Sequence, residues 1–174
     1  MAAVLLLLAL GPAARAGDAR FWPVGEPGGQ PKVVRAWAPP ASPYAPGHRG
    51  VDLAAPIDAP VRAVAGGRVS FAGEVAGRGV LSITLPRTGD PPLRTTYEPV
   101  TALVRRGAEV RAGEVVGTVQ LPTGHCPPVA RSCLHWGLRR GAVYLDPLSL
   151  LGPSALRGRP SRLLPVWGWA WLWT

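Results

Sequence analysis

Glycine and proline occur so often in this sequence that they leave no uninterrupted stretch for a long helix. Their frequency is the feature that most constrains the fold. The chain has 22 glycines and 21 prolines among 174 residues. Between them lie short runs in which apolar and polar residues alternate, as in half-buried strands. These runs are 61–65, 68–75, 80–85, 93–97, 115–121, 132–139 and 143–145. The pattern predicts a mostly β protein, with a small antiparallel sandwich or barrel-like core of short strands and little helix.

Alternation within the runs predicts which side chains share a face. In 61–65, Val61, Ala63 and Ala65 alternate with Arg62 and Val64. In 68–75, the residues predicted to share a face are Val69, Phe71 and Gly73. The only helical signal is Asp146-Pro147, which can begin a short turn over 148–151.

The N-terminus has the pattern of a secretory signal. The apolar run 2–10 is too short to span a bilayer, and Ala14-Arg15-Ala16 fits a cleavage site before Gly17. We therefore expect residues 1–16 to be a signal peptide and the protein to be secreted and associated with the cell wall. The Gly- and Pro-rich stretch 17–31 is predicted to be a linker, and 32–152 a single folded domain.

Residues 153–174 form a tail of a different composition. Three arginines precede four tryptophans that alternate along the last residues: Arg157, Arg159, Arg162, Trp167, Trp169, Trp171 and Trp173. Tryptophan beside arginine is typical of a segment that lies at a membrane surface. The alternatives are a disordered tail or an out-of-frame extension.

The net charge of +9 favours an anionic neighbourhood, such as wall polymers or lipid head groups. Of the 19 basic residues only Lys32 is a lysine, so a GC-rich genome is a second explanation of this charge. No basic run with interleaved aromatic residues marks a nucleic-acid face, and we expect no nucleic-acid partner.

Two separated segments carry candidate metal ligands. In the strand predicted over 132–138, Cys133 and His135 point to one face, and Leu134 and Trp136 to the other. Upstream, His48 and Asp52 are four residues apart, so an extended chain also puts them on one face. Two histidines and an aspartate form a three-ligand zinc set that leaves the fourth position for water.

The ordered series of motifs resembles the lysostaphin-like (LytM-type) zinc peptidoglycan endopeptidases over about residues 46–151. The motifs are His-x-x-x-Asp at 48–52, Val-x-Ala-Val-Ala-x-Gly-x-Val at 61–69, Gly-Arg-Gly-Val at 77–80, Leu-His-Trp-Gly-Leu at 134–138 and Asp-Pro-Leu at 146–148. The resemblance implies a small antiparallel β core and the hydrolysis of peptides in bacterial wall with one zinc. Its metal ligands fall on His48, Asp52 and His135.

Two positions depart from the family's pattern. The catalytic histidine expected two residues before the last ligand is replaced by Cys133. A second one, expected two residues after Tyr97, is replaced by Pro99, or by Glu98 if the following loop is one residue short. Glu98 is either a solvated acid or a general base for the zinc-bound water.

Cys133 admits three interpretations: a disulfide with Cys126, a fourth zinc ligand that would close the site, or an inert buried thiol. A disulfide fits an oxidising compartment and a short loop. His125 is either an exposed loop residue or a replacement for the missing catalytic histidine, which the disulfide would bring over the zinc.

These features together predict a secreted zinc metalloendopeptidase that acts on peptidoglycan peptides as a monomer. The alternative is a non-catalytic module of the same fold that binds the wall or regulates another protein. A third, weaker interpretation is a membrane-surface protein defined by its tryptophan tail.

Overall fold

The structure, a computed structural model, describes residues 19–26, 28–42, 45–121, 126, 132–152 and 156. The mostly β prediction is confirmed, because strands and one short 3-10 helix, η1, make up the regular structure of this part of the chain. The strands are β1 (Val33–Arg35), β2 (Gly50–Ala54), β3 (Pro60–Arg62), β4 (Gly67–Val75), β5 (Arg78–Thr84), β6 (Leu93–Glu98), β7 (Val100–Ala102), β8 (Glu109–Val110), β9 (Val115–Val119), β10 (Cys133–Arg140) and β11 (Val143–Leu145). The helix η1 spans Pro147–Leu150.

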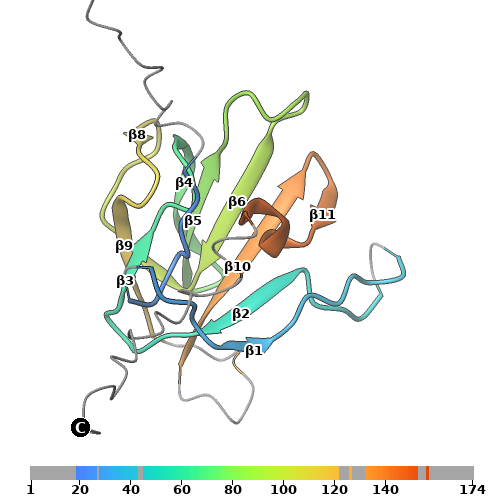
Figure 1. The fold of residues 1–174 in the computed structure, drawn as a ribbon, viewed down its shortest axis with the longest axis horizontal. Coiled ribbons are helices and arrows are strands. Elements are labelled where there is room, and N and C mark those ends of the chain that lie inside the picture. Colours follow the sequence, from blue (N-terminus) through green and yellow to red (C-terminus); the bar gives the residue numbers. More distant parts are fainter. Residues whose placement is uncertain are drawn as a thin grey trace, which may run out of the picture.

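The strands form two antiparallel sheets (Figure 1). The large sheet has the order β1-β2-β10-β6-β5-β4-β8, and the small sheet has the order β3-β9-β7. Strand β10 lies in the interior of the large sheet and has three partners, since β6 pairs along one of its edges and β2 and β11 share the other. Residues 133–137 of β10 pair with β2, and residues 138–140 pair with β11.

The hydrophobic core joins the two sheets. Its largest members with almost no exposure are Trp136, Tyr97, Leu53, Leu81, Ile83, Leu85 and Leu134. The hydroxyl of Tyr97 accepts a hydrogen bond of 3.1 Å from the backbone N–H of Val64. The side chain of Trp136 faces this core, as its place in the sequence pattern predicts, and its indole N–H donates to Thr95 Oγ1 over 2.8 Å.

Part of the predicted linker over 17–31 belongs to the core. Trp22 and Val24 are buried, and Trp22 meets Trp136 edge to face with ring centroids 6.2 Å apart. The N–H of Phe21 also donates to the carbonyl of Val64 over 3.0 Å. Glycine and proline around these residues set the path of the chain, but the apolar side chains between them decide that the segment packs against the sheets.

The predicted alternation is wrong at two places. In β4 the register shifts between Val69 and Phe71, so that Val69 is buried whereas Phe71 is 37% exposed. A β-bulge of this kind moves the following side chains to the other face. In the run 61–65 the strand ends at Arg62 and the chain bends, which buries Val64 as well as its neighbours.

The short helix after β11 begins as the sequence predicts. Asp146 caps it by accepting a hydrogen bond from the N–H of Leu148 over 2.9 Å. Among the described residues, no helix combines the length and apolar character needed to cross a bilayer. The signal peptide expected over 1–16 lies outside the described residues, as does the tail from 157 onward, which holds all its arginines and tryptophans.

Candidate metal centre

The pairing of β2 with β10 brings the two candidate ligand segments together. Asp52 lies directly opposite His135 in the register of these strands. Residues directly opposite in antiparallel strands project to the same face. Their chain neighbours point the other way, where Val51 and Trp136 are fully buried in the core. The apolar residues of both strands therefore fix the register that sets Asp52 beside His135.

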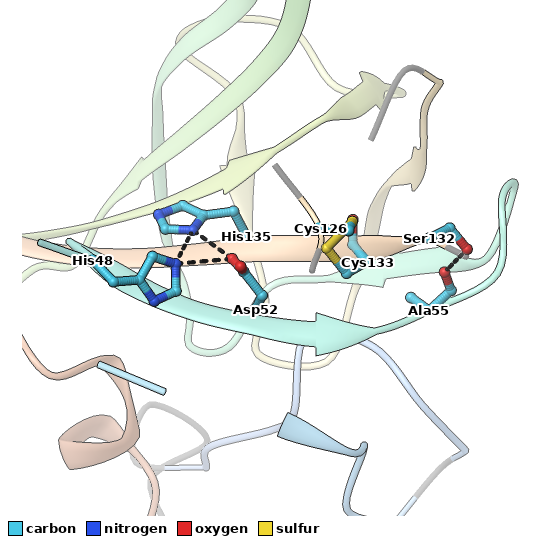
Figure 2. Close-up of a disulfide and its surroundings, with 7 residues drawn as sticks. All are labelled: His48, Asp52, Ala55, Cys126, Ser132, Cys133 and His135. Carbon is cyan, nitrogen blue, oxygen red and sulfur yellow. Dashed lines mark hydrogen bonds and ion pairs between the residues drawn. A yellow bond between two sulfur atoms is a disulfide. The ribbon is translucent and has the colours of Figure 1, made fainter. Parts of the chain in front are cut away.

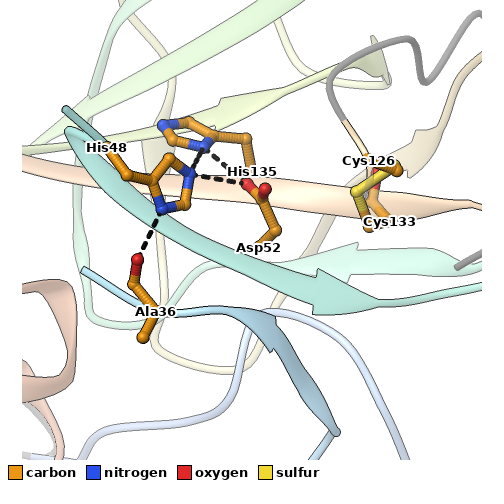
Figure 3. Close-up of polar contacts among 6 residues, drawn as sticks. All are labelled: Ala36, His48, Asp52, Cys126, Cys133 and His135. Carbon is orange, nitrogen blue, oxygen red and sulfur yellow. Dashed lines mark hydrogen bonds and ion pairs between the residues drawn. A yellow bond between two sulfur atoms is a disulfide. The ribbon is translucent and has the colours of Figure 1, made fainter. Parts of the chain in front are cut away.

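Three donor atoms converge at this point (Figure 3). His135 Nδ1 lies 2.8 Å and His48 Nε2 lies 3.0 Å from the same oxygen, Oδ1 of Asp52. The two imidazole nitrogens are 3.1 Å from each other. The side chain of Asp52 is completely buried, that of His48 nearly so, and that of His135 is 16% exposed. The cluster is thus open to solvent mainly on the side of His135.

A backbone carbonyl sets the tautomer of His48. Its Nδ1 lies 2.7 Å from the carbonyl oxygen of Ala36, just beyond β1 (Figure 3). Because a carbonyl oxygen can only accept, Nδ1 carries the hydrogen, and Nε2 presents its lone pair to the cluster. This outer hydrogen bond is the arrangement commonly found behind histidine ligands of metals.

The donor set fits zinc. His48, Asp52 and His135 each offer one ligand atom, and these atoms all lie within 4.8 Å of one another. Imidazole nitrogen and carboxylate oxygen are common zinc ligands, and three protein ligands are the number found in catalytic sites. The metal role of the three residues stays a prediction, and the geometry supplies the convergence that it requires.

Cys126 and Cys133 form a disulfide with an S–S distance of 2.04 Å (Figure 2). Cys133 is two residues before His135 on β10 and faces the same side of the sheet. Because its sulfur is bonded to Cys126, it offers no thiolate, and neither the fourth-ligand nor the free-thiol interpretation holds. The bond attaches residue 126 to the strand that carries a ligand.

Glu98 lies on the metal-bearing face. In the β6–β10 register it is directly opposite His135, on the edge away from Asp52. The alternation of β6 sends Tyr97 into the core and Glu98 to the other face, while Pro99 follows the end of the strand and is buried. Glu98 is therefore better placed than Pro99 beside the ligands. It is half-buried and is not among the three converging donors.

His125, the other candidate catalytic residue, lies outside the described residues. It directly precedes Cys126, and its role stays a prediction.

Two further contributors are not evident from the sequence pattern. Ala36 acts through its backbone carbonyl oxygen. Every residue type carries this group, so the sequence does not mark the position. Gly50 acts by having no side chain, because a Cβ at this position would come within 2.6 Å of His135 Nε2. The signal that was available for Gly50 is its place between His48 and Asp52, where a bulky residue would meet the opposite strand.

Comparisons with known proteins agree with this geometry. The sequence pattern of peptidase family M23 matches residues 46–147. An uncharacterized protein of Mycobacterium tuberculosis is 44% identical over 152 residues, which cover 84% of this chain and 57% of that protein. The chain thus spans little more than half the length of this curated relative.

Two better described proteins also match. The DD-carboxypeptidase/endopeptidase Mpg of Neisseria meningitidis is 32% identical over 107 residues, or 62% of this chain and 23% of Mpg. The catalytic domain of the antimicrobial peptidase lysostaphin from Staphylococcus simulans superposes with a TM-score of 0.53 and 21% identity, covering 68% of this chain and 90% of that domain. At this identity the likeness to lysostaphin concerns the fold.

Proposed function

Because the chain belongs to peptidase family M23, we propose that it is a secreted zinc metalloendopeptidase that hydrolyses peptide bonds of bacterial peptidoglycan. The observation that carries the proposal is the convergence of His48 Nε2, His135 Nδ1 and Asp52 Oδ1 within 2.8–3.1 Å of one another. When bound there, zinc would supply a Lewis acid and a water acidic enough to act as a nucleophile near neutral pH.

The chain's own residues prepare the site for this chemistry. The Ala36 carbonyl holds the hydrogen of His48 on Nδ1, and the complete burial of Asp52 keeps its carboxylate in a fixed position. Glu98, half-buried beside His135, is the described residue best placed to take a proton from an attacking water. A general base of this kind typically contributes about 10²–10⁴ in rate.

His125 is proposed as a second polar group at the site. It precedes Cys126, and the disulfide joins Cys126 to the residue that stands where the family has a catalytic histidine. A cystine cannot donate a hydrogen bond to a developing oxyanion. Loss of one such donor costs about 10²–10³ in rate, so we propose that His125 replaces it.

The departures at 133 and 99 favour one alternative, a non-catalytic module that binds wall peptides. Cys133 is engaged in a disulfide and Pro99 is buried, so neither can perform the role of a histidine.

The deciding experiment measures zinc content and the release of new amino termini from purified walls. We expect the unmodified protein to bind one zinc and cleave, and His135→Ala to lose both properties. Glu98→Gln and His125→Ala should keep the zinc but cleave more slowly, each by about a hundredfold or more.

Each other outcome has a clear meaning. Unchanged zinc in His135→Ala would refute the ligand set. A zinc-loaded protein that cleaves none of the walls but sediments with them would establish the non-catalytic alternative.

A further inference from the structure

Arginines gather on the metal-bearing face of the large sheet, beyond the metal centre. Arg139 of β10 lies directly opposite Arg94 of β6 on one side and Tyr144 of β11 on the other. Arg139 is four residues from His135, so both side chains leave the same face of β10. Since opposite residues of paired strands share a face, Arg94 and Tyr144 project there as well.

The ring of Tyr144 holds two of these cations. The guanidinium carbon of Arg139 and that of Arg49, the residue before β2, each lie 5.7 Å from the centre of the ring. This distance is within the range of cation–π attraction. Arg139 is fixed further because its Nε–H donates to the carbonyl of Gly141 over 2.7 Å. The guanidinium groups are therefore partly ordered before any ligand arrives.

The charges of Arg94 and Arg139 lie close together in the sheet. Like charges directly opposite in a sheet are destabilising, yet Arg94 and Arg139 occupy such a pair of positions. Neither of the two forms an ion pair with a carboxylate of the described residues. Asp146, two residues from Tyr144, uses its Oδ1 to cap η1. An anion that binds here would relieve the repulsion between the arginines.

The backbone spacing between Arg139 and the metal centre follows from the strand that carries both Arg139 and His135. Four residues along β10 separate Arg139 from His135, which corresponds to about 13 Å. The row between them is formed by Gly50, Gly137 and Thr96, so these strands place no long side chain in the interval. An extended peptide covers this distance with about four residues.

We propose that Arg139, held by the ring of Tyr144, and Arg94, directly opposite it in β6, bind a free carboxylate of the peptide substrate, about four residues from the bond at the metal centre. Arginine suits this role because its planar fork of donors matches the two oxygens of a carboxylate. The proposal rests on the proposed function and narrows its substrates to peptides that carry a free acid at this distance.

The test uses soluble peptide fragments of a bacterial wall in two forms, with carboxylates free or converted to amides. Binding to the zinc-loaded full chain is followed by calorimetry. We expect the double variant Arg94→Gln/Arg139→Gln to weaken binding of the free-acid fragments about tenfold and to leave that of the amides unchanged. Added salt should weaken only the free-acid complex. The control is Arg105→Gln, an exposed arginine after β7 with the same charge change.

Several outcomes would overturn the proposal. One is an equal loss for acid and amide fragments, and another is no loss at all. A third is a loss of binding to anionic lipid vesicles in the double variant without any effect on fragments, which would assign the cluster to a membrane surface. Failure of the proposed function is recognised separately, because fragment binding can depend on the arginines even when no wall is cleaved.

Discussion

The imidazole of His135 occupies the space that a side chain at position 50 would need. A Cβ on Gly50 would lie 2.6 Å from His135 Nε2 and even closer to the carbonyl oxygen of Trp136. The carbonyl belongs to a central strand and cannot move far, so an alanine here would push β2 away from β10 as well as displace the imidazole. Glycine at this position therefore allows β2 and β10 to pair closely beneath the imidazole of His135.

We accordingly expect Gly50→Ala to reduce zinc affinity by about ten- to a hundredfold, as is typical when a group that orients a ligand is disturbed. The affinity is measured by competition with a coloured chelator. Gly73→Ala is the matched control, since the nearest atom to its Cβ would belong to the ring of Phe71, at an ordinary distance of 3.4 Å. Equal affinities for the Gly50 variant and the original protein would show that the imidazole does not depend on this space.

At the scale of elements, β1 and the residues after it extend the edge of β2 and support the metal centre from outside. Ala38 and His48 form an isolated bridge, in which the N–H of Ala38 donates to the His48 carbonyl over 3.2 Å and that of His48 donates in return over 2.6 Å. This bridge holds the Ala36 carbonyl oxygen within hydrogen-bond distance of His48 Nδ1. The segment precedes residue 46, where the match to the family begins.

Replacement of Ala38 by proline removes one donor of the bridge. We expect Ala38→Pro to weaken zinc binding about tenfold while the sheets remain folded, because His48 loses the support of its tautomer. Circular dichroism checks the fold and metal titration checks the affinity. Ala41→Pro, at an exposed position three residues later, should behave as the original protein. If both proline variants bind zinc equally well, the outer segment does not contribute to the centre.

The longer strands were predictable, because each carries its own alternation and ends at a glycine or proline. Strands β7 and β8 were not predictable from the sequence, because they have only three and two residues. Their extended conformation depends on pairing with β9 and β4, respectively. The bulge after Val69 was equally hidden. A single extra residue reverses the facing of those that follow, and nothing in the local composition of β4 marks its position.

At the scale of the whole molecule, Tyr97 makes the free energy of unfolding decrease as the pH becomes alkaline. Burial raises its pKa to about 12, against hydrogen bonds with Val64 and Thr95 that act in the opposite direction. The folded state thus holds the phenolic proton more tightly than the unfolded state. This contribution is fully present below pH 10 and is lost as pH rises toward 12, and its full size is about 3 kcal/mol.

Denaturant unfolding at pH 9, 11 and 12 measures the effect, with the pH values chosen around the two pKa values of Tyr97. The free energy of unfolding of the original protein should fall steadily over this range. Tyr97→Phe should be less stable than the original protein at pH 9, because it lacks the hydrogen bond with the Val64 N–H. Its free energy of unfolding should decrease much less between pH 9 and pH 12. Tyr144→Phe, at an exposed tyrosine, should keep the original slope. A full slope in the Tyr97→Phe variant would contradict this account.

The candidate site was predictable to the extent that it depends on spacing within one segment. His48 and Asp52 share a face in any extended chain, and the motif series identified His135. The placement of Glu98 beside His135 depends on the pairing of β6 with β10, which single-strand patterns do not contain. The Cys126–Cys133 disulfide was predictable from the short loop between the two cysteines and from the expected oxidising compartment, and the structure contains it.

The separation of the ligands along the chain has a consequence for folding. Asp52 and His135 are 83 residues apart, and His48 and His135 are 87 apart. In an unfolded chain, closing a loop of this length costs about 4 kcal/mol of entropy, and contacts so distant in sequence form slowly. We therefore expect the three donors to meet late in folding, after most strands between them are in place. Any metal that requires all three then favours the finished topology over every partly folded intermediate.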